Sequence, residues 1–354
     1  DVAVDRHRRV LLEVLLEQDH SLTNELGHRH ALLSPAGDLD TELVGQQPPA
    51  PVVRTECRRA VAGRDVRRHE PAVGRLAERI EVEIDGRTLV AREGQTILDV
   101  CRDAGIEVRK DLLWRFEDGR RSMIEGTPEV WQHGQGGLME VAPHPDYADN
   151  GWIYLSYSEN TGALERNKAA GMTTVVRGKI EDGRWTAQEI LFRVDGRHHT
   201  SSGAHFGSRF VFDDGYLFFG IGDRGRMERA QELNRPNGKI YRIHDDGRVP
   251  EDNPFVDVKD AIPQIWSYGH RNPQGMDKDP ATGLLWESEH GPRGGDEINV
   301  VEKGRNYGWP VITYGMNYNG TPITDETHRE GMEQPKLHWT PSIAVAGIDF
   351  YEGD

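Results

Sequence analysis

The chain has 354 residues, enough for one large domain with an appendage. Its formal net charge of −16 argues against nucleic acid or an anionic membrane as the main partner. No apolar run is long enough to predict a membrane span. The 40 glycines favour short strands joined by turns over long helices. The two cysteines, Cys57 and Cys101, are too few for a disulfide scaffold or a cysteine-based metal site.

The first region, residues 1–79, has weak periodicity and contains arginine but no lysine. We predict that it is largely disordered or irregular. Within it, RHRRVLLEVLLEQ could form a short amphipathic helix. The stretch GQQPPAPVV is typical of an extended linker.

Residues 80–113 have a different pattern. Apolar and polar residues alternate from Ile80 to Ile84, a turn follows at Asp85-Gly86, and a helix is predicted from Thr96 to Ala104. This hairpin followed by a helix resembles the start of a 2Fe-2S ferredoxin-like β-grasp domain. A plant-type cluster needs four thiolates, and only Cys101 lies here. We therefore expect a β-grasp-like fragment without a cluster.

From about residue 120 the chain is strand-rich. Apolar or aromatic runs recur between Gly, Asn and Asp turns, as in GWIYLSYS, TTVVRGKI, GKIYRIHDDG and AIPQIWSYG. FDDGYLFF and IHDDGRVP carry the Asp-Gly hairpin signal. No helices of comparable length alternate with these runs, so we predict an antiparallel sandwich, barrel or propeller. At roughly 40–50 residues a blade, residues 120–354 would form about five propeller blades.

Several longer motifs occur together in this region. They are GQGGLMEVAPHPDYADNGWIYLSYS, HFGSRFVFDDGYLFFGIGDRG, SYGHRNPQG, ESEHGPRGGDEINVVEKGRNYGWP and WTPSIAVAGIDFY. In this order they resemble the soluble quinoprotein glucose/sorbosone dehydrogenases, in particular the aldose sugar dehydrogenase branch. The resemblance implies an all-β six-bladed propeller that binds pyrroloquinoline quinone (PQQ) and Ca²⁺. It also implies oxidation of the anomeric carbon of aldose sugars to lactones, an electron acceptor that the sequence does not name, and a periplasmic or secreted location.

The resemblance assigns His205, in SGAHFGSR, as the general base. An imidazole titrates near neutrality and can accept the proton of a sugar hydroxyl. Gln135, in GQGG, matches a position near the quinone and the sugar. His198 and His199 lie just upstream and could suggest a zinc site, but no carboxylate joins them at a recognisable spacing. We therefore favour the catalytic interpretation of His205.

Arg271 and Asn272, in SYGHRNPQG, are placed at the cofactor by the same resemblance. A guanidinium offers a planar fork of donors to the carboxylates and quinone oxygens of PQQ. It would also stabilise negative charge as the quinone accepts hydride, so Arg271 is both a catalytic and a cofactor-binding candidate. Asn272 can donate through its side-chain amide.

HGPRGGDEIN provides the expected calcium element. Ca²⁺ prefers oxygen ligands, including backbone carbonyls. Gly291 and Pro292 match positions whose carbonyls hold the Ca²⁺ that bridges to PQQ. Glu297 and the carbonyl of Tyr307 match a second, structural calcium site.

The resemblance predicts two shortfalls. The family has a further blade or more after WTPSIAV. Its initial outer strand is replaced here by the β-grasp-like fragment, and we expect DLLWRFEDGRRSMIEGTPEVW (111–131) to retain only the end of the first blade. We expect about five blades of six, and an incomplete ring is expected to impair PQQ binding and activity. Two other functions therefore stay open: a non-catalytic propeller that serves as a binding module, and a calcium-dependent lactonase.

Overall fold

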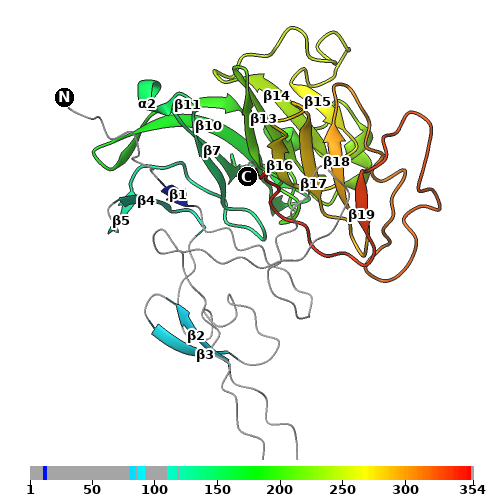
Figure 1. The fold of residues 1–354 in the computed structure, drawn as a ribbon, viewed down its shortest axis with the longest axis horizontal. Helices are drawn as coiled ribbons and strands as arrows, with labels where there is room; N and C mark the ends of the chain where they lie inside the picture. Colours follow the sequence, from blue (N-terminus) through cyan, green and yellow to red (C-terminus); the bar gives the residue numbers. More distant parts are fainter. Residues whose placement is uncertain (1–10, 14–79, 85–86, 92–109, 118–119, 352–354) are drawn as a thin grey trace, which may run out of the picture. The chain divides into compact units, whose positions relative to one another are not determined.

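The structure is a computed structural model of residues 1–354, and it describes residues 11–13, 80–84, 87–91, 110–117 and 120–351 (Figure 1). The chain forms two compact units, Asp1–Leu16 with Lys110–Asp354, and Glu17–Arg109. In the second unit, strands β2 (Ile80–Ile84) and β3 (Arg87–Ala91) pair antiparallel, with Ile80 opposite Ala91. These are the predicted hairpin strands. The predicted helix 96–104 lies outside the described residues, so the β-grasp prediction is not confirmed.

The regular secondary structure of the first unit, where it is described, consists mainly of strands. Its described helices are α2 (Tyr147–Asn150) and the short 3-10 helices η1 (Gly196–His198) and η2 (Met227–Gln231). A three-stranded sheet contains β1 (Leu11–Glu13), β4 (Leu113–Glu117) and β5 (Arg120–Ile124). Strand β1 falls where the sequence suggested a helix, because residues 11–13 pair with the exposed edge of β4. The rest of residues 1–79 lies outside the described part.

Three antiparallel four-stranded sheets follow, each a simple up-and-down meander. The first contains β6 (Leu138–Pro143), β7 (Ile153–Glu159), β10 (Met172–Glu181) and β11 (Arg184–Phe192). The second contains β12 (Phe210–Asp213), β13 (Tyr216–Ile221), β14 (Lys239–His244) and β15 (Ile265–Tyr268). The third contains β16 (Pro273–Lys278), β17 (Leu285–Glu289), β18 (Asp296–Val301) and β19 (Leu337–Trp339).

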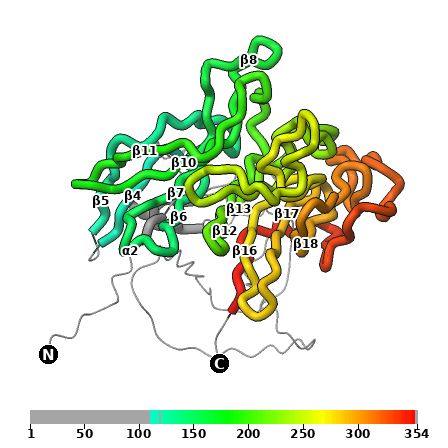
Figure 2. The backbone as a smooth tube through the Cα atoms, turned by 90° about the horizontal axis from the view of Figure 1, so that it is seen from above, coloured from blue at the N-terminus to red at the C-terminus, as the bar shows by residue number. Residues whose placement is uncertain are grey.

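A small hairpin, β8 (Leu164–Glu165) with β9 (Lys168–Ala169), projects from the connection between β7 and β10 (Figure 2).

The two Asp-Gly signals have different outcomes. Asp214 and Gly215 join β12 to β13 with φ of 47° and 76°, the left-handed conformation that a two-residue hairpin turn requires. After β14, Asp246-Gly247 also makes a turn, in which His244 N–H donates to the Arg248 carbonyl. The next strand, β15, begins only at Ile265, so the prediction of a tight hairpin is wrong there. Pro250 lacks an N–H group and cannot continue a ladder.

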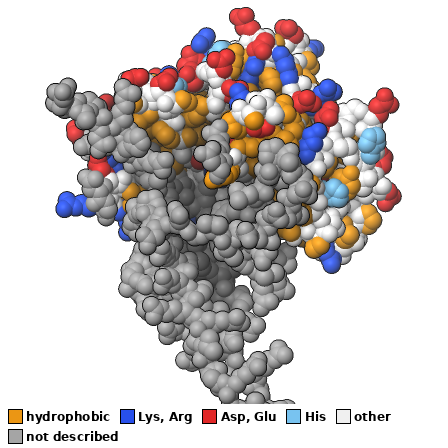
Figure 3. All heavy atoms as spheres, in the orientation of Figure 1, with side chains coloured by type: hydrophobic (Ala, Val, Ile, Leu, Met, Phe, Trp, Pro, Cys, Tyr) orange, Lys and Arg blue, Asp and Glu red, His pale blue; other side chains and the backbone are white. Residues whose placement is uncertain are grey.

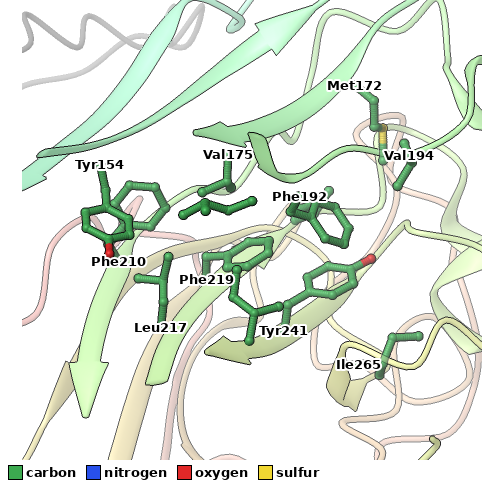
Figure 4. Packing of buried hydrophobic residues seen from close by; sticks show 13 residues of the cluster. Tyr154, Met172, Val175, Phe192, Val194, Phe210, Leu217, Phe219, Tyr241 and Ile265 are labelled. Atoms are coloured by element: carbon green, nitrogen blue, oxygen red, sulfur yellow. The ribbon is translucent and has the colours of Figure 1, made fainter. Parts of the chain in front are cut away.

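Buried side chains pack the sheets face to face. Alternate residues of β13 serve opposite faces, as the period of a strand requires. Leu217, Phe219 and Ile221 belong to a cluster shared with β7, β10 and β11 (Figure 4). Phe218 joins a different cluster, with Met276 of β16. A third cluster joins Leu113 of β4 to the first four-stranded sheet. This stacking of four-stranded meanders is the packing of β-propeller blades.

The predicted count of about five blades is not confirmed. The described residues contain three four-stranded sheets and the three-stranded sheet of β1, β4 and β5. The chain length alone does not determine the number of blades, because long connections such as 193–209, 222–238 and 302–336 contain no strand.

The surface of the described part mixes acidic and basic side chains with apolar ones (Figure 3). None of its helices has the length and apolar character needed to cross a bilayer.

Candidate functional site

The site residues lie in connections at one edge of the sheets. In a meander, alternate connections lie at the same edge. The ends of β13, β15 and β17 therefore meet the starts of β14, β16 and β18. Arg271 and Asn272 lie between β15 and β16, and Gly291 and Pro292 lie between β17 and β18. His205 lies in the long connection between β11 and β12.

His205 is held by Asp223. Its Nδ1 lies 2.7 Å from Oδ1 of Asp223, and its side chain is 16% exposed while that of Asp223 is 2% exposed. Because a carboxylate accepts the Nδ1 proton, the lone pair of the imidazole is left on Nε2. His205 itself has a φ of 56°, an uncommon conformation for a residue with a side chain. The arrangement therefore presents a histidine as a proton acceptor.

Asp223 is anchored by further donors. Gly225 N–H donates to Oδ1 at 2.7 Å, and the Trp309 indole N–H donates to Oδ2 at 2.8 Å. Burial alone would raise the pKa of Asp223, but the hydrogen bond from His205 and the charges of His205 and Arg271 lower it. Asp223 is therefore a fixed carboxylate.

Gln135 sets the backbone of His205. Its side-chain oxygen accepts the His205 N–H at 2.7 Å, and its own N–H donates to the Gly203 carbonyl at 2.6 Å. Gly134 next to it has a φ of 58°, and a Cβ there would lie 2.3 Å from the Gly203 oxygen. The GQGG motif and the loop of His205 are thus in direct backbone contact.

The pKa of His205 is lowered, first by burial and then by the charge of Arg271, and Asp223 only partly offsets these effects. A lowered pKa keeps the imidazole neutral at neutral pH. His205 is therefore in its basic form there.

Arg271 points at the loop that follows β17. Its Nη1 donates to the carbonyls of His290 at 2.6 Å and Gly291 at 2.8 Å. Its guanidinium carbon lies 5.4 Å from the centre of the Trp309 ring, which also holds Asp223. Arg271 and the His205–Asp223 pair thus share one neighbour, and the Arg271 carbonyl accepts the Asp223 N–H at 2.7 Å.

Glu289 fixes the backbone of the Arg271 loop. Its Oε2 accepts the N–H groups of Arg271 at 2.5 Å and Asn272 at 3.2 Å. Asn272 is buried, its side-chain oxygen accepts from Gln274, and its carbonyl accepts the His290 N–H. Asn272 therefore holds its own loop and the next one together.

A recess adjoins these groups, with about 250 Å³ of empty space that includes open solvent. Its lining residues are Arg271, Glu289, His290, Gly291, Gly295, Glu297, Tyr307, Trp309, Ile312 and Thr313. Cationic, carboxylate and carbonyl groups therefore line this small recess.

A buried charged cluster lies beside the recess. His270, Glu287 and Glu289 offer ligand atoms within 4.8 Å of one another and could hold a metal ion. Burial and Glu289 raise the pKa of Glu287 to about 7. Burial acts to lower the pKa of His270, but its contacts with Glu287 and Glu289 raise it to about 9. Oε2 of Glu287 and Oδ1 of Asn299 have no hydrogen-bond partner. Unpaired carboxylate and amide oxygens are the donor set of a hard cation.

Glu297 lies opposite Glu289 in the β17–β18 ladder. Burial and the charge of Glu289 raise its pKa well above the usual value. Its side chain and Tyr307 line the same recess. The residues expected at a structural calcium site are thus close together.

The loop of Gly291 and Pro292 is held by Asp296. Oδ1 of Asp296 accepts the Gly291 N–H at 2.9 Å, and Oδ2 accepts the N–H groups of Ile343 at 2.8 Å and Ala344 at 2.6 Å. A Cβ at Gly291 would lie 2.3 Å from the Gly294 oxygen, so only glycine fits there. Asp296 therefore ties the stretch WTPSIAV to the expected calcium loop.

The structure brings most of the expected residues together. Gln135 bonds the His205 backbone, Asp223 connects His205 to Arg271, and Gly291, Glu297 and Tyr307 share the recess with Arg271. Asn272 is buried and directly follows Arg271 in the chain, and Pro292 is buried next to Gly291. The sequence analysis missed the carboxylates and the indole that hold them, which are Asp223, Glu289, Asp296 and Trp309.

The stacked meanders with polar loops at a shared edge place the chain among the β-propeller proteins. Comparison of the sequence narrows this class: the family described as "Glucose / Sorbosone dehydrogenase" matches residues 106–354. The chain belongs to this family. A second family, described as "2Fe-2S iron-sulfur cluster binding domain", matches residues 77–127.

Individual relatives point to the same family. The Escherichia coli protein named aldose sugar dehydrogenase YliI is 44% identical over 246 residues, which cover 68% of this chain and 64% of that protein. The crystal structure of the soluble E. coli aldose sugar dehydrogenase in the apo form aligns with a TM-score of 0.65 and 42% identity, over 70% of this chain and 72% of that one.

The PQQ-bound aldose sugar dehydrogenase of Streptomyces coelicolor aligns with a TM-score of 0.52 and 27% identity, over 65% of this chain and 62% of that one. The alignment with the curated E. coli relative covers less than two thirds of the length of that protein.

Proposed function

We propose that this chain carries the site of a quinoprotein sugar dehydrogenase, which oxidises the anomeric carbon of an aldose to a lactone by hydride transfer to Ca²⁺-bound PQQ. The observation that carries the proposal is the His205–Asp223 pair, which hydrogen bonds of Asp223 connect to Arg271 and Trp309 in the lining of the recess. The relatives named as aldose sugar dehydrogenases, one of them solved with PQQ, support it.

The residues present fit the two groups. Arg271, which lies over the Trp309 ring in the lining of the recess, offers a cation to the carboxylates of PQQ. The carbonyls of Gly291 and Pro292 would hold the Ca²⁺ next to it, and Glu297 with the Tyr307 carbonyl would hold a second one. Asn272 would support Arg271. When bound, PQQ supplies a two-electron acceptor and Ca²⁺ makes it more electrophilic.

Side chains of this protein would accept the proton of the sugar hydroxyl. Nε2 of His205 would accept the proton of the anomeric hydroxyl while the hydrogen on the same carbon leaves with its electron pair, which yields the lactone. Asp223 would stabilise the resulting imidazolium through Nδ1. Gln135 would keep the imidazole at the sugar, and Arg271 would offset the negative charge that develops on the acceptor.

The test is reconstitution. The protein is loaded with PQQ and Ca²⁺, and reduction of an artificial dye is followed with glucose and other aldoses. His205→Gln should lower kcat by about 10²–10⁴-fold, the usual contribution of a general base, and leave the PQQ affinity unchanged. Glu251→Gln, at an exposed position, is the control.

Two outcomes would contradict the proposal. Consumption of a lactone without dye reduction would indicate a calcium-dependent lactonase. PQQ-independent sugar or protein binding without turnover would indicate a binding module.

A periplasmic or secreted location, which we also propose from the family resemblance, is checked by cell fractionation of the native host.

A further inference from the structure

Arg224 is a fully buried cation next to the proposed catalytic pair. Its side chain has no solvent exposure, and its guanidinium carbon lies 3.2 Å from the centre of the Phe206 ring. Nη2 donates to the Ser202 carbonyl at 2.7 Å, and Nη1 donates to the Ala204 carbonyl. A buried charge is costly unless its donors are used, so this side chain needs the loop that carries His205.

The loop needs Arg224 in turn. His205 has a φ of 56°, a conformation that persists for a non-glycine residue only where its surroundings impose it. The carbonyls on its N-terminal side are all engaged: Ser202 and Ala204 by Arg224, and Gly203 by the N–H of Gln135. Arg224 supplies two of these three contacts.

Asp223 and Arg224 act from one tight turn. The Arg226 N–H donates to the Asp223 carbonyl at 3.0 Å, and the two central residues, Arg224 and Gly225, have φ of 56° and 64°. Two consecutive positive φ values define a type I′ turn. The turn directs the Asp223 side chain to the imidazole of His205 and the Arg224 side chain to the backbone before it. The ring and its backbone are thus fixed from one rigid element.

We propose that Arg224 is a positioning residue, whose guanidinium holds the Ser202 and Ala204 carbonyls so that the imidazole of His205 stays aligned with Asp223. The role of His205 rests on the function proposed above, but the alignment itself does not. Three charged groups face the imidazole, namely Asp223, Arg224 and Arg271. Burial lowers the pKa of Arg224 to about 9, which leaves it charged at neutral pH.

The experiment compares Arg224→Met and Arg224→Lys with a matched control, Arg242→Met. Arg242 is 6% exposed and also stacks on aromatic rings, with its guanidinium carbon 4.4 Å from the Tyr216 ring centre and 4.3 Å from that of Trp266. It lies on β14 and bonds Asn253 rather than the His205 loop. The two methionine variants therefore remove a similar buried cation at different places.

The first readout does not depend on activity. In protein labelled with ¹³C-histidine and free of cofactor, the His205 NMR signal is assigned by its loss in His205→Gln and followed through a pH titration. Arg224→Met should shift this signal and raise the pKa of His205, because a positive charge has gone. Arg224→Lys should shift the signal with a smaller change in pKa, since an ammonium keeps the charge but lacks the longer, planar fork that holds both carbonyls in place. Arg242→Met should change neither.

The second readout is turnover with PQQ and Ca²⁺, where Arg224→Lys should lower kcat by about 10²-fold without changing the affinity for PQQ. An unchanged His205 signal and pKa in Arg224→Lys would overturn the proposal, and that variant decides the question if Arg224→Met does not fold. If the parent protein fails to oxidise sugars, the proposed function fails, while the titration still tests the positioning role.

Discussion

At the scale of single residues, the Asp223 carboxylate joins separate parts of the proposed site. Its carboxylate accepts from the side chains of His205 and Trp309 and from the backbone of Gly225. These donors are far apart along the chain, and His205 and Trp309 lie on opposite sides of Asp223 in the sequence. The carboxylate thus connects the proposed base, the indole under Arg271 and the turn of Arg224.

Asp223→Asn tests this connection. The amide keeps the shape but removes the negative charge that stabilises imidazolium, so kcat with PQQ, Ca²⁺ and sugar should fall by about 10²-fold or more. Loss of that charge lowers the pKa of His205 further. The acid limb of the kcat/KM profile should therefore move to lower pH, which is measured by dye reduction between pH 5 and 9. If the acid limb does not move, Asp223 does not influence the pKa of the base.

The sequence predicts the residues that carry the chemistry better than those that hold them. His205, Arg271 and Gly291 stand in motifs that resemble the family, and the structure brings them to one edge. Asp223 also stands in one of these motifs, at the end of HFGSRFVFDDGYLFFGIGDRG, but its local pattern, a strand followed by a turn, does not indicate its role. Its role depends on a Trp309 indole 86 positions away, and no local pattern encodes such a contact.

At the scale of elements, the sheet of β16–β19 contains charges that a soluble protein seldom buries. Glu287 is fully buried, and Glu289 is 3% exposed. Like charges at such short range destabilise the sheet unless a proton or a cation intervenes. These charges lie on β17 and next to β16, and Glu289 bonds the backbone of the Arg271 loop. The stability of this sheet and the geometry of the site are therefore coupled.

The pH dependence of stability follows from two raised pKa values. Glu287 has a folded pKa of about 7 against 4.5, so the folded state holds the extra proton and stability falls as pH rises from 4.5 to 7. His270 has a folded pKa of about 9 against 6.5, so its contribution is present below 6.5 and is lost as pH rises to 9. Without calcium, the protein should therefore have a lower Tm at pH 9 than at pH 6.

Glu287→Gln tests this origin. The amide removes one charge, so the Tm of the calcium-free protein should rise at pH 8 and its fall between pH 6 and 9 should become smaller. The measurement is thermal unfolding with a chelator, and then with Ca²⁺ or Mg²⁺ added. If the proposed site is present, Ca²⁺ should raise the Tm of the parent by binding only the folded state, and Mg²⁺ should not. An identical pH profile in the parent and Glu287→Gln would locate the titration elsewhere.

The strands themselves were predictable where a local rule governs them. The β12–β13 hairpin follows from Asp-Gly between alternating apolar residues, and β7, β10, β14 and β15 follow from β-branched and aromatic runs. The number of blades could not be predicted from the sequence, because it depends on the lengths of the loops between strands. Connections such as 193–209 and 222–238 are long where they carry His205, Asp223 and Arg224.

At the scale of the whole molecule, aromatic side chains join one sheet to the next. Phe219 of β13 stacks on Tyr241 of β14 with ring centres 5.1 Å apart, and it also meets the Phe192 ring of β11 at 5.1 Å (Figure 4). Phe192 belongs to the first four-stranded sheet and the other two to the second. The opposite face of β13 packs on Met276 of the third sheet. The sheets therefore depend on one another.

Phe219→Ala tests this dependence. Phe219 is fully buried, and its truncation leaves a cavity between two sheets, so the free energy of unfolding should fall by about 3–5 kcal/mol. Because the same residues pack both sheets, the loss should lower a single transition seen alike by tryptophan fluorescence and far-UV circular dichroism. Leu164→Ala, at an exposed position of the β8–β9 hairpin, should change stability by no more than about 0.5 kcal/mol. Two separate transitions in Phe219→Ala, with one at the parent's midpoint, would mean that the sheets unfold independently and that the site at their shared edge is not held by their packing.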